Sequence, residues 1–211
     1  MDGTLVDSVD LHARAWQETL AEFGHIVAFD AIRAQIGKGG DQLLPVFLPP
    51  EELTRIEKKI STRRSALFKD RYLGLVKGFP HVRDLFLRIL QDGKAIALAS
   101  SAAGDELSAY KTKAQIADLV DEETSKDDAE KSKPHPDIFA AVLRKLHLRP
   151  ADVVVVGDTH YDIEAAGALG IDAIGLLCGG FPEGVLRAAG AVAIYRDPAD
   201  LLAEYASSPL A

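Results

Sequence analysis

The sequence predicts an α/β fold, with a doubly wound parallel sheet as its core and a small helical cap inserted near its start. After residue 78, short apolar runs alternate with helical patterns, as in a parallel sheet that helices cover on both faces. Residues 9–77, by contrast, show helical patterns and no strand pattern. We therefore expect the core to comprise residues 1–8 and 78–211, and the cap to comprise residues 9–77.

The predicted cap is a series of helices that glycines and prolines separate. These helices are expected to end near residues 24, 36, 48 and 72. The last of them begins at Glu51 and is long and strongly charged. Because charged side chains on such a helix usually face water, we expect Arg63 and Arg64 to be solvated.

The predicted core alternates strands with helices. Strands are expected at residues 94–100, 119–122, 153–157, 173–177 and 191–195. Helices are expected at residues 80–90, 105–117, 136–147, 182–189, before Gly170 and after Pro198. The clearest strand is the valine run that ends at Gly157, and the acidic run Asp121–Glu130 is expected to be a solvated loop.

Composition and charge exclude several classes of protein. The chain has 24 basic and 32 acidic residues, a net charge of −8, which argues against a nucleic-acid binder. Its single cysteine allows no intrachain disulfide, which fits a reducing compartment. No apolar run approaches the roughly 18 residues of a membrane span, and no signal peptide is visible. We expect a cytoplasmic monomer or homodimer without nucleic-acid or membrane partners.

Polar residues gather where predicted strands end. These groups are Asp2-Gly3-Thr4, Ser100-Ser101, Lys133 ahead of a helix, and Asp158 with Asp162. In open parallel sheets, ligands bind at the carboxyl ends of the strands. Carboxylate oxygens suit Mg²⁺, whereas a hydroxyl and a lysine suit phosphate oxygens. The sequence therefore predicts magnesium-assisted phosphoryl chemistry at this edge of the sheet.

Four motifs, in this order along the chain, resemble the haloacid dehalogenase superfamily of aspartate-nucleophile phosphohydrolases. They are Asp2–Ser8, Ile96–Ser100, Lys133–Phe139 and Val156–Ile163. The helical insert directly after the first motif is similar to the subgroup with a small helical cap, which includes phosphoglycolate-phosphatase-like and β-phosphoglucomutase-like proteins. The resemblance implies a Rossmann-like core, Mg²⁺ as the cofactor and a small phosphorylated metabolite as the substrate.

The resemblance also implies roles for the matching residues. Asp2 corresponds to the general acid/base, whose backbone carbonyl also binds Mg²⁺. Ser100 corresponds to the hydroxyl that holds the transferring phosphoryl group, and Lys133 to the lysine that neutralises its charge. Asp158 corresponds to the main carboxylate on the metal, and Asp162 to a supporting one.

Further residues are candidates for contacts with the substrate or its phosphate. Thr4 and Ser101 adjoin the motif residues, although the strand register favours Ser100 over Ser101. His12 is similar to a histidine at the cap entry of β-phosphoglucomutase-like sequences, but helix surface or hinge packing is the simpler interpretation. Lys38 lies in Gly37-Lys38-Gly39-Gly40, which is either an ordinary cap loop or a loop that faces a charged leaving group.

Lys131 competes with Lys133 for the role of the motif lysine. The Pro-x-Pro sequence that follows Lys133 restricts the backbone there and favours Lys133 over its neighbour.

The first motif begins without the apolar strand that would lead into it. In the family, that strand is central, and the nucleophilic aspartate at its end would directly precede Met1. Burying about five apolar side chains of such a strand contributes roughly 7–15 kcal/mol. That is as large as the whole stability of a typical domain, about 5–15 kcal/mol. We therefore expect Met1 to be an internal residue of the functional protein.

The favoured function is Mg²⁺-dependent hydrolysis of a small phosphomonoester through an aspartyl-phosphate intermediate, as in phosphoglycolate phosphatases. A sugar-phosphate mutase is the alternative within the enzymes, because the segment His12–Trp16 favours it. The spacing of the two aspartates in Gly157–Asp162 favours a phosphatase instead. A catalytically inactive phosphate-binding relative is the alternative from another class, if the nucleophile is truly absent.

Overall fold

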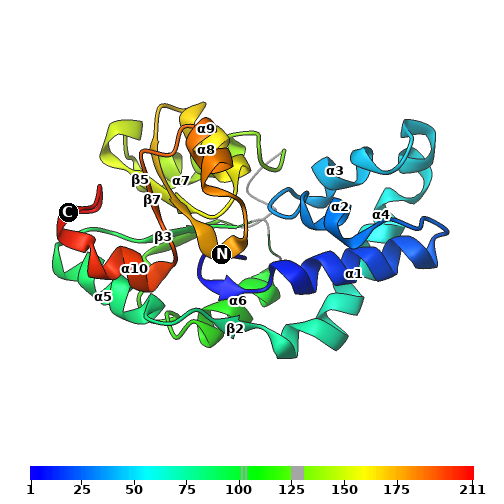
Figure 1. The fold of residues 1–211 in the computed structure, drawn as a ribbon, viewed down its shortest axis with the longest axis horizontal. Helices are drawn as coiled ribbons and strands as arrows, with labels where there is room; N and C mark the ends of the chain where they lie inside the picture. Colours follow the sequence, from blue (N-terminus) through cyan, green and yellow to red (C-terminus); the bar gives the residue numbers. More distant parts are fainter. Residues whose placement is uncertain (101, 103, 125–130) are drawn as a thin grey trace.

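The computed structural model describes residues 1–100, 102, 104–124 and 131–211, which form a helical part and an α/β part (Figure 1). The helical part lies at the right of Figure 1. Along the sequence, it is flanked by two short strands, β1 (Val6–Asp7) and β2 (Lys77–Gly78). These strands pair antiparallel, with Val6 opposite Gly78, so both ends of the helical stretch lie side by side. Its helices are α1 (Val9–Glu22), α2 (Phe29–Arg33), α3 (Gly40–Leu43) and α4 (Pro50–Leu67), which continues into the π-helical turn η2 (Phe68–Tyr72).

The α/β part contains only parallel strand pairs among the described residues. Its strands are β3 (Ala97–Ala99), β4 (Glu122–Thr124), β5 (Val154–Gly157), β6 (Asp172–Leu176) and β7 (Ala193–Tyr195). Its helices are α5 (Val82–Gln91), α6 (Gly104–Lys113), α7 (Asp137–Leu146), α8 (His160–Gly167), α9 (Glu183–Ala188) and α10 (Pro198–Ala203). Short 3₁₀ turns occur at Leu44–Val46, Leu73–Leu75, Pro150–Asp152, Leu177–Gly179 and Tyr205–Ser207. The predicted α/β class with parallel strands is thus confirmed.

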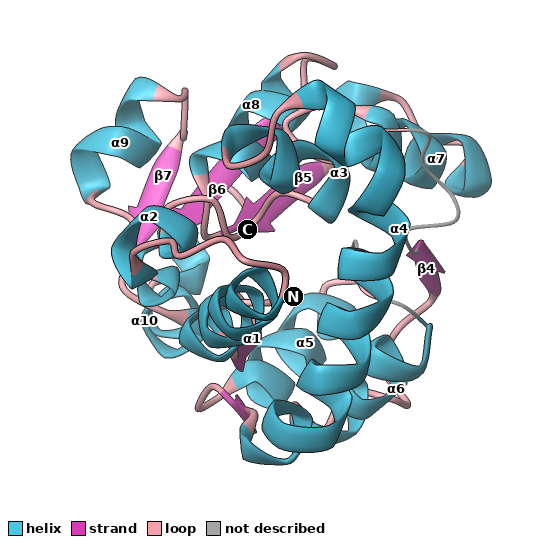
Figure 2. Cartoon of the chain, turned by 90° about the vertical axis from the view of Figure 1, so that its right-hand side faces the viewer, coloured by secondary structure: helices cyan, strands magenta, loops and turns pink. Residues whose placement is uncertain are grey.

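The parallel strands form two sheets. One contains β3 and β4, and the other has the order β5-β6-β7, with β6 in the middle (Figure 2). Val155 lies opposite Ala173, and Ile174 opposite Ala193, which fixes the register of the larger sheet. Because parallel strands end on the same edge, the loop after Gly157 begins at the edge where ligands bind in such folds.

The helical part has a hydrophobic cluster of its own. Its buried members are Val9, Ala13, Trp16, Leu20, Ile32, Ile36, Leu43, Leu44, Leu48 and Ile60. A second cluster joins Phe68 and Tyr72 of η2 to apolar residues of α5, α6 and β3. The helical part is therefore packed internally and is anchored to the α/β part at η2. Its assignment as a cap domain over residues 9–77 stays a prediction.

Strand β4 differs from the expected arrangement. The predicted strand at 119–122 lies instead at Glu122–Thr124, inside the acidic run that was expected to be a loop. Two lysines explain how acidic residues fit a strand here, because Lys145 lies 3.5 Å from Glu122 and Lys111 donates to Glu123 at 2.5 Å. The rest of that run, residues 125–130, falls outside the described residues.

Candidate active site

A cavity of about 110 Å³ lies where the helical part meets the α/β part. The α/β side supplies the motif residues, and the helical part supplies residues from α1, α4 and the loop before α3. Its lining includes Asp2, Ser100, Lys133, Asp158, Asp162, His12, Lys38 and Arg64. The structure therefore brings together, in one cavity, most of the residues that the sequence nominated from distant segments.

Asp2 is held by the start of α1. Its Oδ1 accepts hydrogen bonds from Ser8 Oγ at 2.6 Å and from His12 Nε2 at 2.7 Å. Ser8 directly precedes α1 and His12 lies one helical turn further on, so this helix positions both donors. Burial raises the pKa of Asp2, but the interaction with His12, the largest of the lowering effects, brings that pKa well below its usual value. The Asp2 carboxylate is therefore ionised in this arrangement.

Asp158 follows β5 and is fitted between two glycines. A Cβ at Gly3, where φ is +68°, would lie 2.1 Å from Asp158 Oδ2, and one at Gly179 would lie 1.9 Å from it. Thr4 Oγ1 donates to Asp158 Oδ1 at 2.7 Å. Asp158 Oδ2 is buried and has no hydrogen-bond partner within the described part of the chain. Burial, followed by repulsion from Asp162, raises the pKa of Asp158 above its usual value.

Lys133 and Asp162 form a buried ion pair. Lys133 Nζ donates to Asp162 Oδ1 at 2.6 Å, and Asp162 Oδ2 accepts from the backbone N–H and hydroxyl of Thr159. Thr159 caps α8 in return, since its hydroxyl accepts from the Asp162 N–H. Burial lowers the pKa of Lys133, but the Asp162 carboxylate outweighs burial and raises that pKa overall. Lys133 therefore stays protonated, whereas its competitor Lys131 is exposed.

Ser100 lies directly after β3 and is buried. Its N–H donates to Thr124 O at 3.3 Å, and its Oγ accepts from the Ala102 N–H at 3.1 Å. Within the described residues, the hydroxyl hydrogen has no acceptor and can donate to a ligand, because a serine hydroxyl both donates and accepts. Ser101 lies outside the described residues. Thr4 is not part of the cavity lining, and its predicted phosphate contact stays a prediction.

The residues fit a divalent cation only in part. A buried, unpaired oxygen such as Asp158 Oδ2 is the donor that Mg²⁺ prefers. Both oxygens of Asp162, by contrast, are already occupied by Lys133 and Thr159. Across residues 1–100, 102, 104–124 and 131–211, no group of three or more histidine, cysteine or acidic side chains is placed to hold a metal. The assignment of Asp2, Asp158 and Asp162 to a metal stays a prediction.

His12 is buried rather than on the helix surface. Its ring stacks on Phe68, with centroids 4.0 Å apart, and Arg64 contacts its Nδ1. An arginine can only donate, so His12 Nδ1 must be the acceptor and Nε2 must carry the proton. His12 Nε2 therefore donates to Asp2, and Tyr110 OH lies 2.9 Å from the same nitrogen. The surface interpretation of His12 is therefore wrong, and its predicted contact with the substrate stays a prediction.

Lys38 lies in a glycine loop that rests on the α/β part. Its Nζ donates to Gln35 Oε1 at 2.7 Å and lies 4.9 Å from the centre of the Tyr161 ring. Burial lowers the pKa of Lys38. A Cβ on Gly37, where φ is +110°, would lie 2.6 Å from Thr159 Cγ2. The loop therefore packs directly beside the motif that contains Asp158, and Lys38 lines the cavity.

Sequence reasoning missed Arg64 and Glu106, which also line the cavity. The Arg64 side chain is 15% exposed and the Glu106 side chain 4% exposed, so Arg64 is not solvated as expected. Arg63 does face water, paired with Glu22. Arg64 lies four residues after buried Ile60, and this helical spacing could have placed it on the buried face of α4.

No helix in the described part of the chain is long and apolar enough to cross a membrane.

Comparisons with known proteins identify the family of the chain. The family model described as haloacid dehalogenase-like hydrolase matches residues 1–176. A phosphorylated carbohydrates phosphatase of Thermotoga maritima is 27% identical over 207 residues, covering 96% of this chain and 94% of that protein. A phosphoglycolate phosphatase of Yersinia pseudotuberculosis is 32% identical over 184 residues, covering 85% of this chain and 79% of that protein.

Solved structures show the same fold. A hydrolase from Pseudomonas syringae matches with a TM-score of 0.89 at 28% identity, covering 98% of this chain and 95% of that one. A candidate β-phosphoglucomutase from Bacteroides vulgatus matches with a TM-score of 0.86, covering 98% of this chain and 85% of that one. At 19% identity, the second likeness concerns the fold alone. With a family model matched over most of its length, the chain belongs to the haloacid dehalogenase-like hydrolases and is related to phosphoglycolate phosphatases.

Proposed function

We propose that the protein is a Mg²⁺-dependent phosphatase that hydrolyses a small phosphomonoester through an aspartyl-phosphate intermediate. The observation that carries this proposal is the cavity itself, which unites an ammonium, a hydroxyl and an unpaired carboxylate oxygen from three separate motifs. These groups are Lys133, Ser100 and Asp158. Lys133 provides positive charge and Ser100 a donor for phosphate oxygens, while Asp158 offers an oxygen to a metal ion, and phosphoryl transfer uses all three kinds of group.

Lys133 and Ser100 act on the transferring phosphoryl group. Lys133 stays protonated because Asp162 faces it at 2.6 Å, so its charge is available to phosphate oxygens. Ser100 is buried, and its Oγ is already oriented by the Ala102 N–H, so the hydroxyl hydrogen can point toward an oxygen of the substrate. Both groups are in place before the substrate binds, which reduces the cost of reorganisation.

Asp2 transfers protons to and from the reacting oxygens. Its ionised form can accept a proton from the water that cleaves the aspartyl phosphate. Before that, it must donate a proton to the leaving oxygen, and the charge of an incoming phosphoryl group favours protonation of the Asp2 carboxyl. Ser8 and His12 hold Oδ1 throughout and so keep the carboxyl group in one orientation.

Mg²⁺, when bound, would neutralise developing charge on the phosphate oxygens. Asp158 is the residue that would hold it, through the unpaired Oδ2. In the haloacid dehalogenase-like family, an aspartate attacks phosphorus.

A phosphatase assay tests the proposal. Release of inorganic phosphate by the purified protein should be followed with and without Mg²⁺. The panel should contain 2-phosphoglycolate and several sugar phosphates, since relatives are named for both classes. We expect turnover with Mg²⁺ and none after chelation. Isomerisation of a sugar phosphate without phosphate release would favour the mutase, and phosphate binding without turnover would favour the inactive relative.

A further inference from the structure

Arg64 and Glu106 face each other across the cavity. Arg64 belongs to α4 of the helical part and Glu106 to α6 of the α/β part. The Arg64 guanidinium and Glu106 Oε1 are 3.8 Å apart, which is too long for a hydrogen bond. Both side chains line the cavity, and neither belongs to a motif that handles the phosphoryl group.

Each partner has a hydrogen-bonding atom that remains unused. Arg64 Nε is a buried donor and Glu106 Oε1 a buried acceptor, and neither has a hydrogen-bond partner among the residues that the structure describes. Leaving such groups unpaired costs free energy, so a site with both is prepared for a ligand that supplies the missing partners.

Aromatic rings fix the position of the guanidinium. Its central carbon lies 5.4 Å from the centre of the Trp16 ring and 5.1 Å from that of Phe68. Arg64 also donates to His12 Nδ1. The guanidinium is therefore held at the cavity without the strong ion pair that would consume its donors.

A hydroxyl group matches this pair, whereas a carboxylate does not. A hydroxyl can accept from Arg64 and donate to Glu106 at the same time. A carboxylate can only accept, and it would meet the charge of Glu106 in a buried site, where like charges repel strongly. We infer that Arg64 and Glu106 form the leaving-group subsite and select polyol phosphates over phosphorylated carboxylic acids.

The leaving-group subsite rests on the proposed phosphatase function. The preference for esters that carry hydroxyl groups is a separate prediction about binding affinity. The competing explanation is that Arg64 and Glu106 merely hold the two parts of the molecule together. A neighbouring ion pair provides a control for this explanation, because Lys69 of η2 lies 2.6 Å from Asp105 of α6. That pair joins η2, the continuation of α4, to the same helix α6, but it does not line the cavity.

Binding can be measured separately from turnover. Isothermal titration calorimetry with Mg²⁺, on the Asp2→Asn protein, should compare sn-glycerol 3-phosphate, 2-phosphoglycolate and ethyl phosphate. These esters carry hydroxyls, a carboxylate and neither group, respectively. A hydrogen bond to a charged group corresponds to about 10- to 100-fold in affinity. We expect glycerol phosphate to bind about tenfold or more tightly than either other ester.

Two variants in the same background identify the residues responsible. Glu106→Gln should reduce the preference for glycerol phosphate over 2-phosphoglycolate by about tenfold or more, because it removes the charge that repels a carboxylate. Asp105→Asn should leave that preference unchanged. In the active protein, Asp105→Asn should leave turnover of p-nitrophenyl phosphate within about twofold of its original value, because Asp105 does not line the cavity.

Three results would overturn the inference. One is tighter binding of 2-phosphoglycolate than of glycerol phosphate by the parent protein. Another is a Glu106→Gln protein with an unchanged preference. The third is an equal loss of affinity for all three esters in Glu106→Gln and Asp105→Asn. That result is expected if the contact only joins the two parts of the molecule. Absence of turnover, with the binding preference intact, would instead count against the proposed function alone.

Discussion

The two walls of the cavity hold their polar groups in different ways. On the α/β wall, Asp162 is tied by hydrogen bonds to Lys133 and Thr159, all within 3.1 Å. On the helical wall, Arg64 rests between aromatic rings and faces Glu106 at 3.8 Å. The first wall holds the Asp162 carboxylate fully hydrogen-bonded, whereas Arg64 on the second wall keeps a buried donor, Nε, that has no partner among the described residues. This difference suits a protein in which reaction and selectivity are assigned to separate elements.

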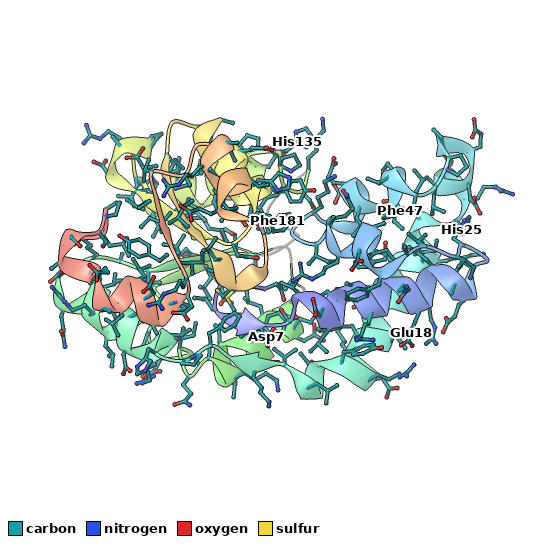
Figure 3. All side chains as sticks on the ribbon, viewed as in Figure 1. Asp7, Glu18, His25, Phe47, His135 and Phe181 are labelled. Carbon is teal, nitrogen blue, oxygen red and sulfur yellow. The ribbon has the colours of Figure 1, made fainter. Side chains whose placement is uncertain are left out.

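Replacing Asp2 tests the α/β wall most severely. Asp2→Asn keeps the hydrogen bond from Ser8 but removes proton transfer, so kcat should fall by about 10²–10⁴-fold. Asp7, an exposed carboxylate of the same motif (Figure 3), is the matched control, and Asp7→Asn should leave kcat unchanged. Steady-state kinetics, with circular dichroism to confirm folding, measures both. If the Asp2→Asn protein is folded and has a near-normal kcat, Asp2 does not transfer the proton.

Breaking the buried ion pair between Lys133 and Asp162 tests whether the paired charges stabilise the α/β wall. Lys133→Met leaves Asp162 buried without its partner and should lower the free energy of unfolding by about 3–5 kcal/mol. Lys131→Met, at the exposed lysine two residues earlier, should have little effect. Urea unfolding measures the difference. Adding Asp162→Asn to Lys133→Met should restore part of the loss, and no restoration would contradict the explanation by an unpaired charge.

The motif residues of the α/β wall could be predicted from the sequence because each motif is a short contiguous segment at the end of a strand or the start of a helix. Lys133 was distinguishable from Lys131 by the prolines that follow it. Arg64 and Glu106 could not be predicted as a pair, because they meet only through the packing of two helices far apart in the chain. Strand β4 was misplaced for a similar reason, since lysines from other elements neutralise its acidic residues.

The glycine loop tests how closely the helical wall must approach the α/β wall. Gly37→Ala would bring a methyl group to 2.6 Å from Thr159 and should lower kcat/KM by about tenfold, by displacing the loop. Gly24→Ala separates this effect from backbone strain, because Gly24 also has a positive φ but no atom within 4 Å of an added Cβ. Gly24→Ala should lower the melting temperature while leaving kcat/KM unchanged. Equal losses of kcat/KM in both variants would show that strain, rather than contact with Thr159, is responsible.

The smallest effect is expected on the outer face of the same helix that carries Arg64. Arg63 pairs with Glu22 at 2.6 Å, but both side chains are more than 40% exposed, so water screens the pair. An exposed ion pair contributes at most about 1 kcal/mol, so Arg63→Ala should lower the melting temperature by no more than about 4 °C. Arg64→Ala, one residue further, removes packing against Trp16 and Phe68 and should lower it more. Differential scanning calorimetry compares the two, and a larger loss in Arg63→Ala would mean that solvent-exposed charge, rather than the cavity wall, stabilises α4.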